Sequence, residues 1–139
     1  MQFNKKFGNR IVTMSKANKG DLQKYKKQIT TYAVSTKNRI NILEDSSYYY
    51  LKIQDADSKL IGLVQISEID TMAAEIKVSI PNSPWELRYG TEVVHQLVKY
   101  FIENKPYSRI YLKKNETVDR YKKERPEMFA NGNYYIEVA

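Results

Sequence analysis

The sequence predicts an α+β (α/β) protein with a mixed antiparallel and parallel central sheet and helices on both faces. Three strand-like segments follow one another through short turns between residues 48 and 80, which favours an antiparallel meander. Farther along, an amphipathic helix lies between two strand-like segments, as in a right-handed crossover between parallel strands. Segregated meander and crossover parts are typical of this fold class.

The first third of the chain predicts a short strand over residues 10–15 and a helix that begins at Asp21. Apolar residues recur at helical spacing along one face of this helix: Leu22, Tyr25, Ile29, Tyr32 and Ala33. The polar segment 35–47 is expected to be irregular or weakly helical.

The meander is predicted from three patterns. Residues 48–54 are typical of a strand, and residues 55–58 supply turn-forming side chains. The nearly continuous apolar run 60–66 indicates a central strand that is buried on both faces. Residues 74–80 alternate strictly between apolar and polar, which indicates a strand with one buried face.

The second half of the chain predicts the crossover. Pro81 and Pro84 end the third strand of the meander, because proline cannot donate a ladder hydrogen bond. A helix is expected over residues 91–103, which carry a broad apolar stripe, and a strand over residues 108–113.

A short helix and a strand are expected to complete the chain. Asn115 is a suitable N-cap for the helix, which Pro126 limits. Asn131-Gly132 is a turn signal, and residues 134–138 are the expected last strand.

Composition narrows the functional classes. A length of 139 residues suits one domain over residues 1–139. The absence of cysteine excludes disulfides and thiolate metal ligands, and the single histidine argues against a histidine-rich metal site, so no metal is expected. The chain has neither an apolar run that could span a membrane nor the apolar core of a signal peptide at its start, so we expect a cytoplasmic protein without a membrane partner. The net charge of +7 favours a basic, soluble surface, with a phosphorylated cofactor or nucleic acid as the sharper alternative.

Two segments carry a resemblance to a known family. The stretch AEIKVSIPNSPWELRYGTEVVHQLVKYFIE, from Ala74 to Glu103, resembles the strand, loop and helix that bind the cofactor in GNAT acetyltransferases. The stretch SRIYLKKNETVDRYKK, from Ser108 to Lys123, is similar to the following strand, the asparagine-capped turn and the tyrosine-bearing helix of that family. The resemblance implies a single GNAT-like domain and the transfer of an acetyl group from acetyl-CoA to an amine.

The resemblance also implies a cofactor site, although the loop departs from the family's Arg/Gln-x-x-Gly-x-Gly/Ala pattern. Trp85 takes the place of the first arginine or glutamine, Arg88 takes the place of the first glycine, and Gly90 is retained. By resemblance, the backbone of residues 78–80 would pair with the pantetheine arm of coenzyme A. The expected cofactor-binding residues are Val78, Ser79, Ile80, Arg88, Tyr89, Gly90, Thr91 and Asn115.

The altered loop can be interpreted in three ways. A helix that begins near Thr91 would offer its free N–H groups to a pyrophosphate, and Gly90 would let the backbone approach closely. Arg88 would then either bind a phosphate or block the groove. An ordinary helix start preceded by a glycine explains the same residues without a ligand.

Two residues are the catalytic candidates. The resemblance implies that Tyr121 acts as the general acid toward the departing thiolate, and the alternative is that it packs in the core. Glu75 lies on the polar face of the alternating strand, where a carboxylate could deprotonate the amine. The alternative for Glu75 is a solvated strand position or a cross-strand partner for a lysine.

We therefore expect an enzyme, an N-acetyltransferase whose partners are a coenzyme A thioester and an amine acceptor. The acceptor cannot be read from the sequence, and a homodimer is left open. The first alternative is a GNAT-fold binding module that has lost transfer activity. A basic nucleic-acid-associated protein ranks last, because no nucleic-acid-binding motif is present.

Overall fold

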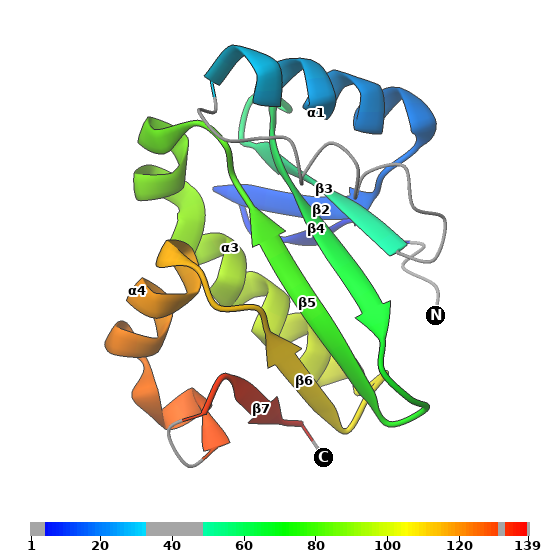
Figure 1. The fold of residues 1–139 in the computed structure, drawn as a ribbon, viewed down its shortest axis with the longest axis vertical. Helices are drawn as coiled ribbons and strands as arrows, with labels where there is room; N and C mark the ends of the chain where they lie inside the picture. Colours follow the sequence, from blue (N-terminus) through cyan, green and yellow to red (C-terminus); the bar gives the residue numbers. More distant parts are fainter. Residues whose placement is uncertain (1–4, 33–48, 131–132, 139) are drawn as a thin grey trace.

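The sheet runs through the whole molecule in sequence order. The computed structural model describes residues 5–32, 49–130 and 133–138. Its strands form one seven-stranded sheet in the order β1 to β7 (Figure 1). The strands are β1 (Phe7–Gly8), β2 (Val12–Lys16), β3 (Tyr49–Asp55), β4 (Leu60–Glu68), β5 (Ala73–Ser79), β6 (Arg109–Leu112) and β7 (Tyr135–Glu137). Every neighbouring pair is antiparallel except β5 and β6, which are parallel. The mixed sheet confirms the predicted meander and crossover.

Helices pack on both faces of this sheet. In the part of the chain that the structure describes, they are α1 (Lys19–Tyr32), α3 (Ser83–Asn104), α4 (Glu116–Glu124) and the short 3₁₀ helix η1 (Pro126–Met128). The larger apolar cluster joins the sheet to α3 and α4, and includes Leu51, Ile76, Leu97 and Tyr121. A separate cluster on the other face holds Tyr25 of α1 against Tyr50, Leu60 and Leu63. The predicted fold class is therefore confirmed.

The central strand β4 is buried along most of its length, as its apolar run predicts. Its register with β3 shifts between Ile53 and Gln54, so its side chains do not alternate strictly between the two apolar clusters. Gly62 lies where β4 approaches the end of β5, and a Cβ there would come within 2.3 Å of the Ser79 carbonyl oxygen. Only glycine permits this close approach.

The predicted start of the second helix is wrong. The helix α3 begins at Ser83, about two turns before the predicted start at Thr91. Asn82 caps it, with its side chain accepting from the N–H of Trp85, and Pro84 occupies the first turn. Proline fits the first turn of a helix because its missing N–H has no partner there, so Pro84 opens α3 as well as ending the strand region.

The other predicted elements agree with the structure to within two residues at each described end. The two-residue strand β1 was missed, because so short a strand carries no periodicity. The predicted character of residues 35–47 and the predicted turn at residues 131–132 lie outside the described residues.

Candidate active site

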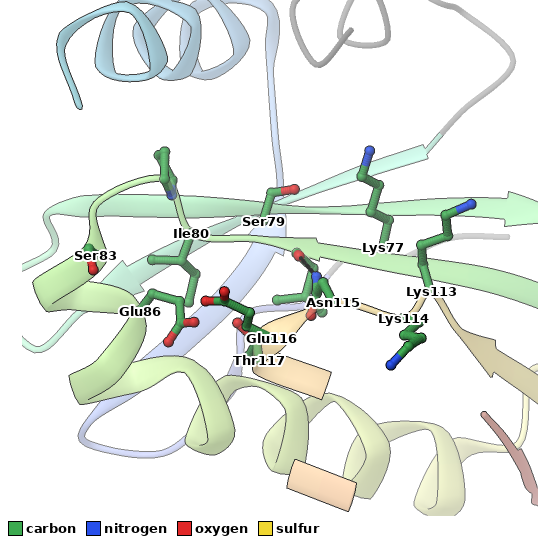
Figure 2. Close-up of a pocket in the computed structure, with 12 residues that line it drawn as sticks. Lys77, Ser79, Ile80, Ser83, Glu86, Lys113, Lys114, Asn115, Glu116 and Thr117 are labelled. Atoms are coloured by element: carbon green, nitrogen blue, oxygen red, sulfur yellow. Dashed lines mark hydrogen bonds between the residues drawn. The ribbon is translucent and has the colours of Figure 1, made fainter. Parts of the chain in front are cut away.

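The parallel strands β5 and β6 separate and form a fork. Their pairing runs as far as Ile76 and Leu112, and the N–H of Lys113 adds one more hydrogen bond, 2.8 Å long, to the Ile76 carbonyl. β5 then continues to Ser79 while β6 ends. A cavity of about 430 Å³ lies in this fork (Figure 2). Its walls come from β5 and the turn after it, from the first turn of α3, from the connection between β6 and α4, and from the start of α4.

Asn115 bridges the fork. Its Nδ2 donates to the Val78 carbonyl oxygen at 2.8 Å, and its Oδ1 accepts from the N–H of Val118 at 2.9 Å. The first contact ties the β6–α4 connection to β5, and the second caps α4. One side chain therefore fixes both the opening of the fork and the start of the helix beside it. The predicted cap at Asn115 is confirmed.

The main-chain groups of β5 alternate between its two neighbours. Since the carbonyl of Ile76 accepts from β6 and that of Val78 accepts from Asn115, the peptide groups of Val78 and Ile80 face the fork. Those of Ser79 face β4, where Ser79 pairs with Leu63. Of the three expected pantetheine-binding residues, two therefore present their backbone to the cavity.

The ionisable side chains around the cavity are distributed unevenly. Figure 2 shows Ser83 and Glu86 of α3 at one end of the cavity and Lys77 and Lys113 at the other, with Asn115 between them. The carboxylate of Glu86 forms an ion pair with Arg120 of α4. The side chain of Glu86 is only 14% exposed, so this contact is shielded from solvent. The α3 end of the cavity thus carries carboxylates, of which that of Glu86 is paired with Arg120, and the sheet end carries Lys77 and Lys113.

The N-terminus of α3 has few free amides. Pro84 has no N–H, the N–H of Trp85 faces the Asn82 side chain at 3.4 Å, and that of Glu86 donates to the Asn82 carbonyl at 2.8 Å. The N–H of Ser83 is the remaining amide of the first turn. The site at this helix start is therefore not the open row of donors that a pyrophosphate requires.

The residues predicted to form the pyrophosphate loop lie inside α3. Because α3 already includes Ser83, the amides of residues 88–91 belong to the helical hydrogen-bond ladder. A Cβ on Gly90 would lie 2.9 Å from Cγ2 of Thr117, so the missing side chain allows α3 to pack closely on α4. Gly90 is buried, and its observed contact is with protein.

Arg88, Tyr89 and Thr91 are not among the residues that line the cavity. Arg88 is exposed, with its guanidinium carbon 5.0 Å from the ring centroid of Tyr89. The side chain from this region that does reach the cavity is Glu86. Neither Arg88 nor Trp85 therefore fills the cavity, contrary to the expectation for a blocked groove.

Tyr121 lies in the interface between α4 and α3. Its side chain is fully buried, and its hydroxyl is hydrogen-bonded to Nδ1 of His95 at 3.0 Å. Burial raises the pKa of Tyr121 to about 12. Burial also lowers the pKa of His95, and the charges of Arg125 and Lys99 act in the same direction. Neither Tyr121 nor His95 lines the cavity, so the predicted general-acid role of Tyr121 stays a prediction.

Glu75 is exposed on β5, opposite Ser67 of β4 and Tyr111 of β6. It lies on the face of the sheet that Lys77 and Ser79 share, away from α3. Glu75 does not line the cavity, and its predicted role as a general base also stays a prediction.

Sequence reasoning missed the ionisable side chains that line the cavity, among them Lys77, Glu86 and Lys113. Lys77 and Lys113 could have been predicted from the sequence. They lie near the carboxyl ends of the parallel strands β5 and β6, and polar residues at such ends face the same edge of the sheet. Glu86 could not have been predicted, because the helix start that brings it to the cavity was misplaced.

The comparisons with known proteins give a fold. No family model matches the sequence, and no curated protein matches it. Among solved structures, mutant forms of the spermidine/spermine N-acetyltransferase SpeG from Vibrio cholerae are similar to this chain with a TM-score of 0.63 and 18% identity, over 93% of this chain and 95% of that one. The spermidine N-acetyltransferase of the same bacterium, in complex with CoA and spermine, is similar with a TM-score of 0.60 and 20% identity. This match covers 94% of this chain and 97% of that one. The chain has the GNAT fold.

Within residues 5–32, 49–130 and 133–138, acidic and histidine side chains form no cluster of three or more that could hold a metal ion. Over the same described ranges, the helices lack the length and apolar character needed to cross a membrane.

One of these solved structures contains CoA, and the two halves of that molecule would fit this site differently. The pantetheine half would fit, because the fork presents the N–H of Val78 and the peptide groups of Ile80 to an extended chain, while the Val78 carbonyl is bonded to Asn115. The pyrophosphate does not fit the usual place at the start of α3, because the amides there are engaged and Glu86 lies beside them.

Proposed function

We propose that this protein is an N-acetyltransferase that holds the pantetheine arm of a thioester donor, acetyl-CoA as the sequence predicts, between β5 and β6. The observation that supports the proposal is the fork itself, with the peptide groups of Val78 and Ile80 directed into a cavity of about 430 Å³. An amide-rich arm can pair with such an open strand edge as an additional strand would. Main-chain pairing of this kind does not depend on the residues of the altered loop.

Each lining residue has a part in the proposed binding. The Val78 N–H and the peptide groups of Ile80 pair with the arm, and Asn115 holds the fork open at a fixed width. Acetyl-CoA supplies an activated acyl group. In the overall reaction the acyl carbon–sulfur bond breaks and an acyl carbon–nitrogen bond forms, while the amine loses one proton and the thiolate gains one.

The groups that move these protons stay proposals. Glu75 is proposed as the base for the amine because it is an exposed carboxylate on the same strand as the fork. Tyr121 is the proposed acid, although its hydroxyl contacts His95. The relatives named above act on spermidine and spermine. For this chain the acceptor is an amine, and Lys77 and Lys113 at the sheet end of the cavity oppose the approach of a polycation.

A thiol-release assay tests the proposal. The chain has no cysteine, so every free thiol that appears comes from the donor. Acetyl-CoA would be supplied with spermidine, free amino acids, aminoglycosides and lysine peptides in turn. We expect saturable thiol release with at least one class of amine. No release with any amine, together with no donor binding by calorimetry, would overturn the proposal.

A second function is favoured by a specific contact. Because the Tyr121 hydroxyl is bonded to His95, the protein would serve as a binding module if no other group protonates the thiolate. A binding module would bind the donor in calorimetry but release no thiol with any amine.

A further inference from the structure

We propose that the cavity holds its donor by the pantetheine arm alone, so that the nucleotide half of coenzyme A contributes nothing to binding. The donor class is then a thioester of pantetheine or phosphopantetheine, whether free or attached to a larger carrier. The proposal rests on the proposed function, because it assumes that the fork binds a thioester arm.

The amides at the start of α3 are largely engaged. Pro84 has no N–H, and the N–H groups of Trp85 and Glu86 both face oxygen atoms of Asn82. A pyrophosphate needs several convergent N–H donors. The single amide of Ser83 does not provide them, and the amides of residues 88–91 are within the helix.

Gly90 is packed against another helix. A phosphate loop uses glycine so that the ligand can approach the backbone. Here the space beside Gly90 is filled by Thr117, whose Cγ2 lies 2.9 Å from the position of a Cβ. Gly90, the glycine that the sequence shares with the family pattern, therefore allows close packing of α3 on α4.

The charge at the α3 end of the cavity does not favour a pyrophosphate. The carboxylates of Glu86 and Glu116 both line it, and like charges repel a pyrophosphate. The guanidinium of Arg120 is already paired with Glu86. Lys59 lies over the Trp85 ring, 4.8 Å from its centroid, and Lys114 is paired with Asp119 at 3.1 Å. The nearby cations therefore have other partners.

The remaining lysines are at the wrong end for a pyrophosphate. Figure 2 shows Lys77 and Lys113 beyond Asn115, on the side away from Ser83 and Glu86. An arm that enters from the α3 end would bring its thioester, rather than its phosphates, toward these lysines. The cavity thus has the main-chain surface for the arm without a phosphate site at its entrance.

Calorimetric titrations with three probes test the inference: acetyl-pantetheine, acetyl-CoA and adenosine bisphosphate. We expect acetyl-pantetheine and acetyl-CoA to bind with dissociation constants within about threefold of each other. Adenosine bisphosphate is expected not to compete with either. A dissociation constant for acetyl-CoA that is about tenfold or more lower than that of acetyl-pantetheine, or competition by the nucleotide, would overturn the inference.

The outcomes separate this inference from the proposed function. If acetyl-CoA binds and acetyl-pantetheine does not, this inference fails and the proposed function stands. If neither donor binds, both fail. A thioester on a purified phosphopantetheine-carrying protein distinguishes the two sources: tighter binding than acetyl-pantetheine indicates a carrier-borne donor, and equal or weaker binding indicates a free one.

Two variants test the charge argument. Glu116→Gln removes an exposed carboxylate, and Glu86→Gln removes a carboxylate and releases Arg120. Each is expected to tighten the binding of acetyl-CoA relative to acetyl-pantetheine, by about threefold or more. Glu103→Gln, which removes a carboxylate from the far end of α3, is the matched control and is expected to leave the ratio unchanged. An unchanged ratio in Glu116→Gln would contradict the charge argument even if Glu86→Gln fails to fold.

Discussion

Asn115 and Val78 are joined across the fork by a side-chain hydrogen bond of 2.8 Å from Nδ2 to the carbonyl oxygen. The contact lies two residues beyond the last paired position of β5, Ile76. It replaces the ladder hydrogen bond that a longer β6 would make there. The cavity exists because β6 ends before this point, and the side chain of Asn115 takes the place of a strand beside Val78.

Asn115→Ser tests this contact. Serine still caps α4 but is too short to reach Val78 as well. We expect a loss of about 1 kcal/mol in the free energy of unfolding, measured by urea denaturation, and weaker binding of acetyl-pantetheine. Asn82→Ser is the matched control, since Asn82 caps α3 without bridging two strands. Equal effects of the two substitutions would show that only capping matters.

Gly90→Ala tests the packing of α3 on α4. Alanine favours the helix by about 1 kcal/mol, but its Cβ would crowd Thr117, and overpacking costs about 1–3 kcal/mol. We expect Gly90→Ala to destabilise the protein. In a Thr117→Ser background the crowding methyl is gone, so the same change is expected to be neutral or stabilising.

A double-mutant cycle on thermal unfolding measures the coupling between these two positions. If the effects of the two substitutions on stability were additive, α3 and α4 would have to lie farther apart than they do in the structure. The double variant is also expected to bind acetyl-CoA as the wild type does, because Gly90 is not a phosphate contact in this account.

His95 is expected to make stability depend on pH. Its pKa is lowered in the folded protein, mainly by burial, so the unfolded chain binds more protons than the folded one below the ordinary histidine pKa. Stability is therefore complete above that pKa and is lost as the pH falls through it toward the folded pKa. His95 is the only histidine in the chain.

Urea denaturation between about pH 7.5 and about pH 5.5 checks this expectation. The free energy of unfolding should fall with acidification in the wild type and fall less in His95→Gln. Identical slopes in the two proteins would contradict the account.

Tyr121→Phe separates the structural role of Tyr121 from the catalytic one. The variant loses the hydrogen bond to His95, which is expected to cost about 0.5–1.5 kcal/mol of stability. A general acid in the reaction would lower kcat by about 100-fold or more when removed. As the proposed acid, Tyr121 is expected to show such a fall in kcat on substitution, whereas a fall of less than about tenfold would leave it a structural role alone, in keeping with a hydroxyl outside the cavity lining. A larger fall in kcat with an unchanged KM would establish Tyr121 as the acid.

The sheet could be predicted from the sequence because its strands carry strong local signals. The alternation of residues 74–80 and the apolar run 60–66 each define a strand and its buried faces. The parallel pairing of β5 and β6 followed from the helix between them. Asn115 was recognised because a capping residue acts over only three positions.

The start of α3 could not be predicted in the same way. Pro81 and Pro84 were both interpreted as strand breakers, although Pro84 lies in the first turn of a helix capped by Asn82. Because the helix start was misplaced, Gly90 was predicted to lie in a loop, whereas it lies in the interface between α3 and α4. The charge pattern of the cavity depends on contacts between distant segments, such as Glu86 with Arg120, and local sequence carries no signal for them.

The central claim is that the fork between β5 and β6 receives the pantetheine arm through the peptide groups of Val78 and Ile80. An amide NMR spectrum of the isotope-labelled protein, recorded during titration with acetyl-pantetheine, tests it most directly. The account predicts that the amide signals of Val78 and Ile80 move saturably and belong to the most strongly shifted ones. Saturable shifts elsewhere with these two amides unmoved, or no shifts at all, would contradict it.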